Sequence, residues 1–267
     1  MLRSDSRTSG QMRPIRLTPH YTKNADGSVL IEVGDTKVIC TVSVEDGVPH
    51  YLRNAQPPQG WLTAEYSMLP GSSTQRIRRD RNGAVGGRTQ EIQRLIGRAL
   101  RGVIDLNRCP NLTFNIDCDV IQADGGTRTA AITGAYVAMR LAVAKLLRAG
   151  RLRQSPLHDA VAAVSVGMKQ GQLLVDLNYI EDSSADLDMN VVLTQGGKIL
   201  EIQGTAERAR RQEVSNLPAV GRGLFWLPSR PPGPHQPGCP QPRKVPSSFQ
   251  APAGSLRRVL AAQEVLE

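Results

Sequence analysis

The chain has 267 residues, of which 40% are hydrophobic and 21% are charged, as in ordinary globular proteins. A formal net charge of +9 favours a polyanionic partner, while an aromatic content of 4% argues against a surface that stacks single-stranded bases. No apolar run approaches the roughly 18 residues of a membrane span, and the basic N-terminal segment lacks a secretory core, so we expect a cytoplasmic protein.

The first half of the chain predicts several strands followed by a helix. Residues 28–44 predict two strands joined at a Gly-Asp turn, and "WLTAEYSML" (61–69) predicts a third. Residues 88–104 predict an amphipathic helix, whose apolar face is formed by Ile92, Leu95, Ile96, Ala99 and Leu100.

The second half adds a strand at 112–123 and a long helix that begins at Thr129 to Ala131 and stops at Gly150. Two further hairpins are predicted at 160–180 and 187–205. Several strands with two long helices indicate an α+β or mixed α/β domain.

The stretch "QADGGTRTAAITGA" (122–135) joins a predicted strand to the long helix. Its glycines allow backbone amides to approach a ligand, and a helix start favours negative charge. Thr127 adds a hydroxyl and Arg128 adds a guanidinium suited to phosphate. The sequence therefore favours an anion site, although a glycine turn with a threonine helix cap and a surface arginine explains the same residues.

A second polar group lies in "EDSSADLDMNVVLT" (181–194). In a strand from residue 186, Asp186, Asp188 and Asn190 share one face, and Asp182 falls on the same polar side. Crowded carboxylates without His or Cys suit Mg²⁺ or Mn²⁺. A solvated acidic turn is the alternative.

Arginines are concentrated in "RIRRDR" (76–81), followed by Arg88, which fits either a nucleic-acid contact or a solvated loop. Four cysteines without a C-x-x-C pair disfavour a zinc site or disulfide framework, and no serine, cysteine or histidine nucleophile motif is present. An anion cradle, an acidic cluster and an arginine-rich loop together suit metal-assisted phosphoryl chemistry.

Six blocks of the sequence closely resemble the ribonuclease PH family, bacterial phosphate-dependent 3′-to-5′ exoribonucleases that trim transfer RNA precursors. In chain order these blocks are "GWLTAEYSMLP", "GRTQEIQRLIGRALR", "DCDVIQADGGTRTAAITGA", "VAAVSVG", "DLNYIEDSSADLDMNVVLT" and "EIQGTAE". The resemblance runs from about Arg3 to Glu207. It implies a ribosomal-protein-S5-domain-2-like α+β fold and a homohexamer built as a trimer of dimers.

The resemblance also implies roles for individual residues. The phosphate-binding positions are matched by Arg88, Gly126, Thr127 and Arg128. Asp182 and Asp188 match paired metal-binding and catalytic aspartates, and Asp186 matches a supporting acidic position. Arg76 and Arg79 resemble arginines that grip RNA, whereas Gly71 stands where relatives usually carry another arginine.

The implied activity is phosphorolysis: inorganic phosphate, with Mg²⁺ or Mn²⁺, attacks the last phosphodiester of the RNA and releases a nucleoside diphosphate. The reverse reaction adds nucleotides. Two alternatives are a catalytically silent RNA-binding ring subunit and a hydrolytic, metal-dependent nuclease.

The C-terminal segment departs from the family. We place the folded domain at residues 1–207, because residues 208–267 are rich in Pro, Gly, Arg and Ser without a sustained hydrophobic period. This composition predicts a disordered tail or the product of a frameshift near codon 207.

Overall fold

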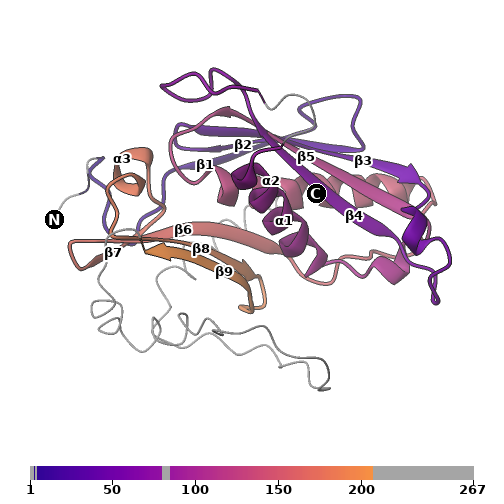
Figure 1. The fold of residues 1–267 in the computed structure, drawn as a ribbon. Helices are drawn as coiled ribbons and strands as arrows, with labels where there is room; N and C mark the ends of the chain where they lie inside the picture. Colours follow the sequence, from indigo (N-terminus) through magenta and orange to yellow (C-terminus); the bar gives the residue numbers. More distant parts are fainter. Residues whose placement is uncertain (1–2, 4, 80–84, 207–267) are drawn as a thin grey trace.

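Two β-sheets enclose two helices in the computed structural model, which describes residues 3, 5–79 and 85–206 (Figure 1). The main elements are β1 (Ile15–Pro19), β2 (Gly27–Val33), β3 (Thr36–Asp46), β4 (Trp61–Met68), α1 (Gly87–Arg101), β5 (Leu112–Gln122), α2 (Thr127–Arg148), β6 (Val161–Lys169), β7 (Gln172–Val175), α3 (Tyr179–Asp182), β8 (Leu187–Thr194) and β9 (Ile199–Ala206). The predicted α+β class is confirmed. The predicted tail lies outside the described residues.

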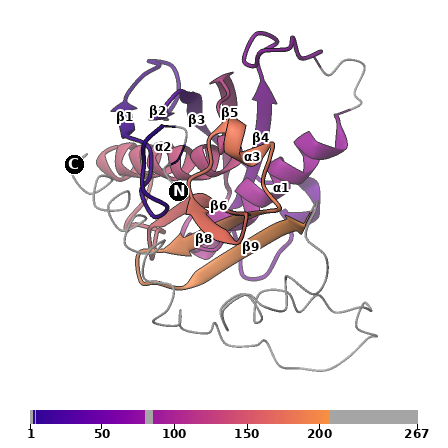
Figure 2. The same cartoon turned by 90° about the vertical axis from the view of Figure 1, so that its left-hand side faces the viewer.

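The first sheet has the order β1-β2-β3-β5-β4, with antiparallel pairs except for the parallel pair β4–β5. The second sheet, β7-β6-β8-β9, is antiparallel throughout. Figure 2 shows α1 and α2 as a layer between the sheets. The hairpins predicted at 28–44 and 187–205 are confirmed. The hairpin predicted at 160–180 also forms, but its second strand ends at Val175, and α3 follows where the strand was expected to continue. Neither β1 nor α3 was predicted.

The hydrophobic periodicity of the strands and helices predicts which residues form the core. In β3 the alternate residues Val38, Cys40, Val42 and Val44 are buried, as alternation in a half-covered sheet requires. All five apolar residues predicted for one face of the 88–104 helix are buried in α1. Burial of these side chains removes apolar surface from water and holds sheet and helices together.

Helix α2 is apolar on nearly every side, because sheets cover it from both directions. It is the one described helix whose length and composition would suit a membrane span, which corrects the expectation that no segment reaches that threshold. However, 78% of its apolar window is buried inside the protein, as expected of a core helix. The helix starts at Thr127, before the predicted Thr129 to Ala131, and ends ahead of Gly150, which has φ +68°.

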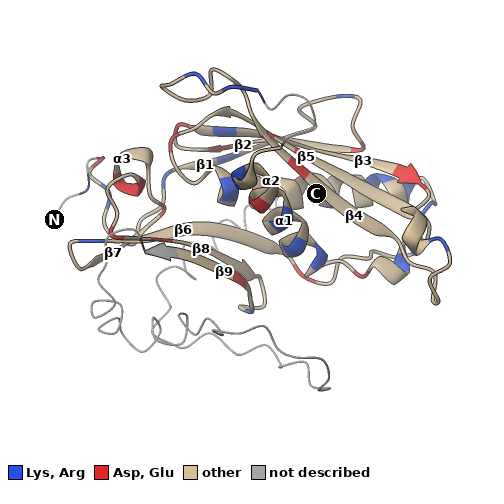
Figure 3. Cartoon of the chain, in the orientation of Figure 1, with Lys and Arg blue, Asp and Glu red and all other residues tan. Residues whose placement is uncertain are grey.

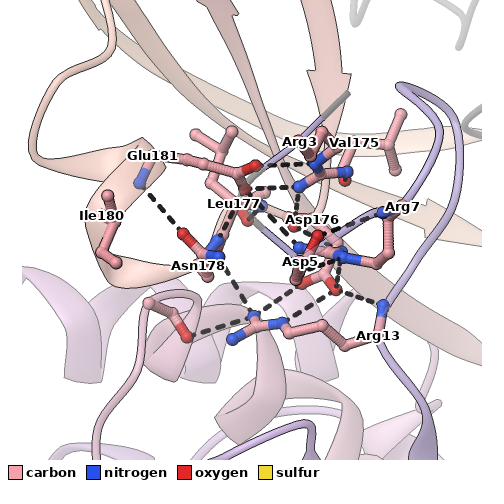
Figure 4. Close-up of polar contacts among 12 residues, drawn as sticks. Arg3, Asp5, Arg7, Arg13, Val175, Asp176, Leu177, Asn178, Ile180 and Glu181 are labelled. Carbon is pink, nitrogen blue, oxygen red and sulfur yellow. Dashed lines mark hydrogen bonds and ion pairs between the residues drawn. The ribbon is translucent and has the colours of Figure 1, made fainter. Parts of the chain in front are cut away.

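An N-terminal segment ties the second sheet to the rest of the domain through buried arginines (Figure 4). Arg3 donates to both Glu181 carboxylate oxygens, at 2.7 and 2.5 Å, and Arg7 contacts Asp176 at 3.1 Å. Arg13 contacts both carboxylate oxygens of Asp176, at 2.7 and 3.0 Å. Asp176 itself holds a left-handed backbone, φ +58°, so these ion pairs fix a conformation that non-glycine residues rarely adopt.

This network of ion pairs lowers the pKa of the Glu181 carboxyl. Burial alone would raise the pKa of its carboxyl, but hydrogen bonds from Arg3 and the Asn178 backbone, with the charges of Arg3 and Arg7, outweigh burial and lower the pKa. A carboxylate with a lowered folded-state pKa stabilises the fold above its unfolded value and loses that contribution as pH falls through the folded value.

We predict that Glu181→Gln lowers the free energy of unfolding at pH 7 by about 3 kcal/mol, because Arg3 is left buried without its counter-charge. Below the ordinary Glu pKa of 4.5, the wild type should lose stability more steeply than the variant. Urea unfolding between pH 3 and 7 measures both. Asp46→Asn, in an exposed pair with Arg151, is the control and should change little. Parallel pH profiles for wild type and Glu181→Gln would contradict the prediction.

A second prediction concerns the contact between β2 and α2. A Cβ atom at Gly27 would lie 2.0 Å from the Ala138 carbonyl oxygen and 2.7 Å from the Ala142 amide nitrogen. Both are helix backbone atoms, so the strand must move away. Gly27→Ala should therefore lower the free energy of unfolding by about 3 kcal/mol or more. Gly71→Ala, where a Cβ meets nothing within 4 Å, should be neutral, and equal urea midpoints for the two variants would refute the close contact.

Candidate active site

A cavity of about 880 Å³ lies where several chain segments meet. It is lined by the loop after β4, the starts of α1 and α2, Ser165 of β6, the end of α3 with the residues after it, and the start of β8. The starts of α1 and α2 carry arginines, whereas α3 carries acidic residues (Figure 3). Groups of opposite charge therefore line one cavity.

The glycine turn predicted to bind an anion lies on this cavity. Gly125 and Gly126 have φ of +73° and +67°, a region that favours glycine, and α2 starts immediately afterwards at Thr127. Gly126 is the N-cap residue, and no side chain caps the helix there. The threonine cap of the alternative interpretation is thus absent, and the first amides of α2 have no acceptor within the helix.

Buried groups behind the turn fix the direction of its peptide planes. The Arg13 guanidinium donates to the Asp124 carbonyl oxygen and, at 3.3 Å, to the Gly125 carbonyl oxygen. The Thr36 hydroxyl donates to the same Gly125 oxygen at 2.7 Å. Because N–H and C=O point in opposite directions in a trans peptide, the Gly125 and Gly126 amides face away from Arg13. Both glycines line the cavity, so this arrangement directs amide donors toward it.

Arg13 is itself held in a charged state. Burial alone would lower its pKa, but the hydrogen bond and charge of Asp176, with the charges of Asp124 and Glu181, outweigh burial and raise the pKa. The same guanidinium donates to the Leu177 carbonyl oxygen at 3.3 Å, directly before α3. Arg13 therefore connects the glycine turn to the segment that carries Asp182.

Three arginines predicted to bind anions line the cavity: Arg76, Arg88 and Arg128. Arg88 is exposed in the first turn of α1, and Arg128 is 17% exposed in the first turn of α2. The Arg128 guanidinium lies 3.6 Å from a Glu91 carboxylate oxygen and 3.4 Å from the Gln203 side-chain oxygen. These neighbours hold Arg128 at the cavity wall.

Thr127 has a buried partner that sequence analysis did not find. The Tyr66 hydroxyl lies 2.9 Å from the Thr127 hydroxyl oxygen, and the tyrosine is 3% exposed. Burial raises the pKa of Tyr66, although the hydrogen bond to Thr127 and the charges of Arg88 and Arg128 act in the opposite direction.

Asp182 and Asp188 come together in the same cavity, with Asn190 and Ser165 beside them. A capping box in which Asn178 and Glu181 satisfy each other's backbone amides starts α3, the helix that carries Asp182. Asp188 and Asn190 share the inner face of β8 and pair with Gly167 and Ser165 of β6.

Asp186 lies elsewhere, against the expectation that it shares the polar face of Asp188. Strand β8 begins only at Leu187, and the Asp186 carboxylate accepts the Gln170 backbone N–H at 2.9 Å in the β6–β7 turn. It does not line the cavity. Alternation along a strand failed to place it because the strand starts one residue later.

Among the described residues, no group of three His, Cys, Asp or Glu side chains is arranged to hold a metal ion. Asp182 and Asp188 nevertheless offer two carboxylates in one cavity, which fits Mg²⁺, an ion commonly held by one or two carboxylates together with substrate phosphates. The donor set therefore suits a metal that completes its coordination with phosphate oxygens or water.

The arginine loop after β4 is anchored at its base. The Ile77 amide donates to the Pro70 carbonyl oxygen at 2.9 Å, and the Ala123 amide donates to the Ser72 carbonyl oxygen at 2.8 Å. Arg76 faces the cavity, whereas Arg79 is exposed outside its lining. Gly71 is exposed on the same loop.

Comparisons with known proteins show the family and the fold of the chain. Residues 11–145 match the model of domain 1 of the 3′ exoribonuclease family, and residues 159–217 match domain 2. The fold is similar to that of rice (Oryza sativa) Rrp46, with a TM-score of 0.68, 17% identity and 98% of each chain covered.

Two archaeal structures are also similar in fold. The Archaeoglobus fulgidus exosome with RNA bound to the active site gives a TM-score of 0.67 at 20% identity, covering 80% of this chain and 86% of that one. An archaeal exosome core gives 0.62 at 19% identity, covering 80% and 84%. With the family models matching most of the chain, the protein belongs to the 3′ exoribonuclease family and has the fold of its ribonuclease PH domains.

Proposed function

We propose that the chain is a phosphate-dependent 3′-to-5′ exoribonuclease that trims the 3′ ends of transfer RNA precursors and other structured RNA. One observation carries the proposal: a single cavity combines the glycine turn, Arg88 and Arg128 with Asp182 and Asp188. A hydrolytic nuclease has no use for a second anion site beside the carboxylates.

In the proposed reaction, inorganic phosphate rests on the Gly126 and Thr127 amides and on the guanidinium groups of Arg88 and Arg128. An oxygen of this phosphate attacks the phosphorus of the terminal nucleotide. The bond from that phosphorus to the preceding O3′ breaks, and this oxygen takes up a proton as the shortened RNA leaves. The product is a nucleoside diphosphate, and the reverse reaction adds a nucleotide. Positioning and charge neutralisation supply the catalysis.

Asp182 and Asp188 would hold Mg²⁺ or Mn²⁺, which when bound offsets negative charge on the transferring phosphoryl group. We leave Asp186 out of this set, since its carboxylate accepts a hydrogen bond in the β6–β7 turn. Arg76 at the cavity and Arg79, exposed on the same loop, would bind the RNA backbone.

The similarity in fold to an archaeal exosome with RNA in its active site supports RNA as the substrate class. A homohexamer built as a trimer of dimers and a cytoplasmic location belong to the same proposal. A catalytically silent RNA-binding subunit remains the second candidate. The fold is also similar to that of rice Rrp46, and similarity in fold does not distinguish an active chain from a silent one.

The products of a 3′-labelled RNA, incubated with Mg²⁺ with and without inorganic phosphate, separate the candidates. We expect labelled nucleoside diphosphates only when phosphate is present. Monophosphates formed without phosphate would indicate a hydrolytic nuclease. No product, together with retained RNA binding, would indicate a silent subunit.

The same assay tests the anion site. Arg128→Ala should reduce phosphorolysis about 100-fold or more, the usual effect of removing one donor that stabilises transition-state charge. Arg148→Ala, at the opposite end of α2 and exposed, is the matched control and should retain wild-type activity. Equal rates for the two variants would contradict the role of Arg128.

A further inference from the structure

A buried tyrosine lies behind the anion site, where neither the reaction nor the family resemblance assigns it a role. Tyr66 belongs to β4, the edge strand against which α1 packs, and its hydroxyl lies 2.9 Å from the Thr127 hydroxyl oxygen. Tyr66 is 3% exposed and Thr127 is 8% exposed. The contact joins two elements far apart in the sequence at the first residue of α2.

The direction of this hydrogen bond follows from the properties of the two hydroxyls. Burial raises the pKa of Tyr66 despite the opposing effects of Thr127, Arg88 and Arg128, so the phenol keeps its proton near neutral pH. A buried phenolic proton needs an acceptor, and the Thr127 oxygen is within hydrogen-bond distance. When that oxygen accepts from Tyr66, the threonine proton must point elsewhere, because a hydroxyl carries a single hydrogen.

Thr127 lines the cavity, as do its neighbours Gly126 and Arg128. A threonine hydroxyl at the start of a helix can otherwise rotate and present either a lone pair or its proton to a ligand. A lone pair turned toward the cavity would repel an anion, whereas a proton would bind it. The hydrogen bond from Tyr66 occupies one of the two lone pairs of the threonine oxygen and leaves the threonine proton available to the anion.

We propose that Tyr66 is a positioning residue that donates to Thr127 and thereby directs the threonine proton at the inorganic phosphate. The inference rests on the proposed phosphate site but concerns a residue that never touches the substrate. It gives the cavity an additional donor matched to a tetrahedral oxyanion, beside the amides of the glycine turn.

Tyr66→Phe removes one oxygen and leaves the ring in the core. We expect the KM for phosphate to rise about three- to tenfold, the range for one hydrogen bond, with kcat changed less than twofold. Isothermal titration calorimetry of the full chain with inorganic phosphate alone should give the same factor in Kd. Tyr136→Phe, a buried tyrosine in the core part of α2, is the matched control and should leave both quantities unchanged.

A double-mutant cycle identifies the threonine as the intermediary. Thr127→Val should weaken phosphate binding, Thr127→Ser should largely restore it, and Tyr66→Phe should add no further loss in the Thr127→Val background. Additive losses would overturn the proposal, as would a Tyr66→Phe variant that binds phosphate like the wild type or fails to fold. Failure of the proposed function has a different signature: wild-type protein that binds no phosphate in the calorimeter.

Discussion

The buried Arg13 guanidinium, with its hydrogen bonds to the Asp124 and Gly125 carbonyl oxygens, is the contact on which the cavity depends. Because Arg13 binds the carbonyl oxygens of these two peptides, the amide N–H groups on their opposite edges remain available to a ligand. Asp176 keeps Arg13 charged and buried, and breaking such a pair costs about 3–5 kcal/mol. The N-terminal segment therefore takes part in the site although it lies outside the cavity lining.

This contact also links the two halves of the domain. The glycine turn leads into α2, in the helical layer between the sheets. Asp188 lies on β8 of the second sheet, and Asp182 lies on α3, which connects β7 to β8. Arg13 reaches the Leu177 carbonyl oxygen, and the Tyr179 amide donates to the Asp124 carboxylate at 3.2 Å. An anion on the turn and a cation on the aspartates would then be held at a fixed separation, which phosphoryl transfer requires.

Local sequence patterns predicted most elements of this fold, because the hydrophobic periodicity of a strand or helix depends only on residues close together in the sequence, as in β3 and α1. They also predicted Arg88, Thr127, Arg128 and the Asp182/Asp188 pair as candidate residues that the fold brings to one cavity. They missed Arg13 and Tyr66, whose partners lie more than 60 positions away and follow no local period. Asp186 was misplaced because it precedes β8, so that strand alternation does not determine the direction of its side chain.

The most direct test of the central claim is a crystal structure of the protein with inorganic phosphate. We predict a phosphate within hydrogen-bond distance of the Gly126 and Thr127 amides and the Arg128 guanidinium, with the Asp124 and Gly125 carbonyls still bound to Arg13. A turn whose carbonyls point into the cavity, or a phosphate bound elsewhere with this turn empty, would contradict the account.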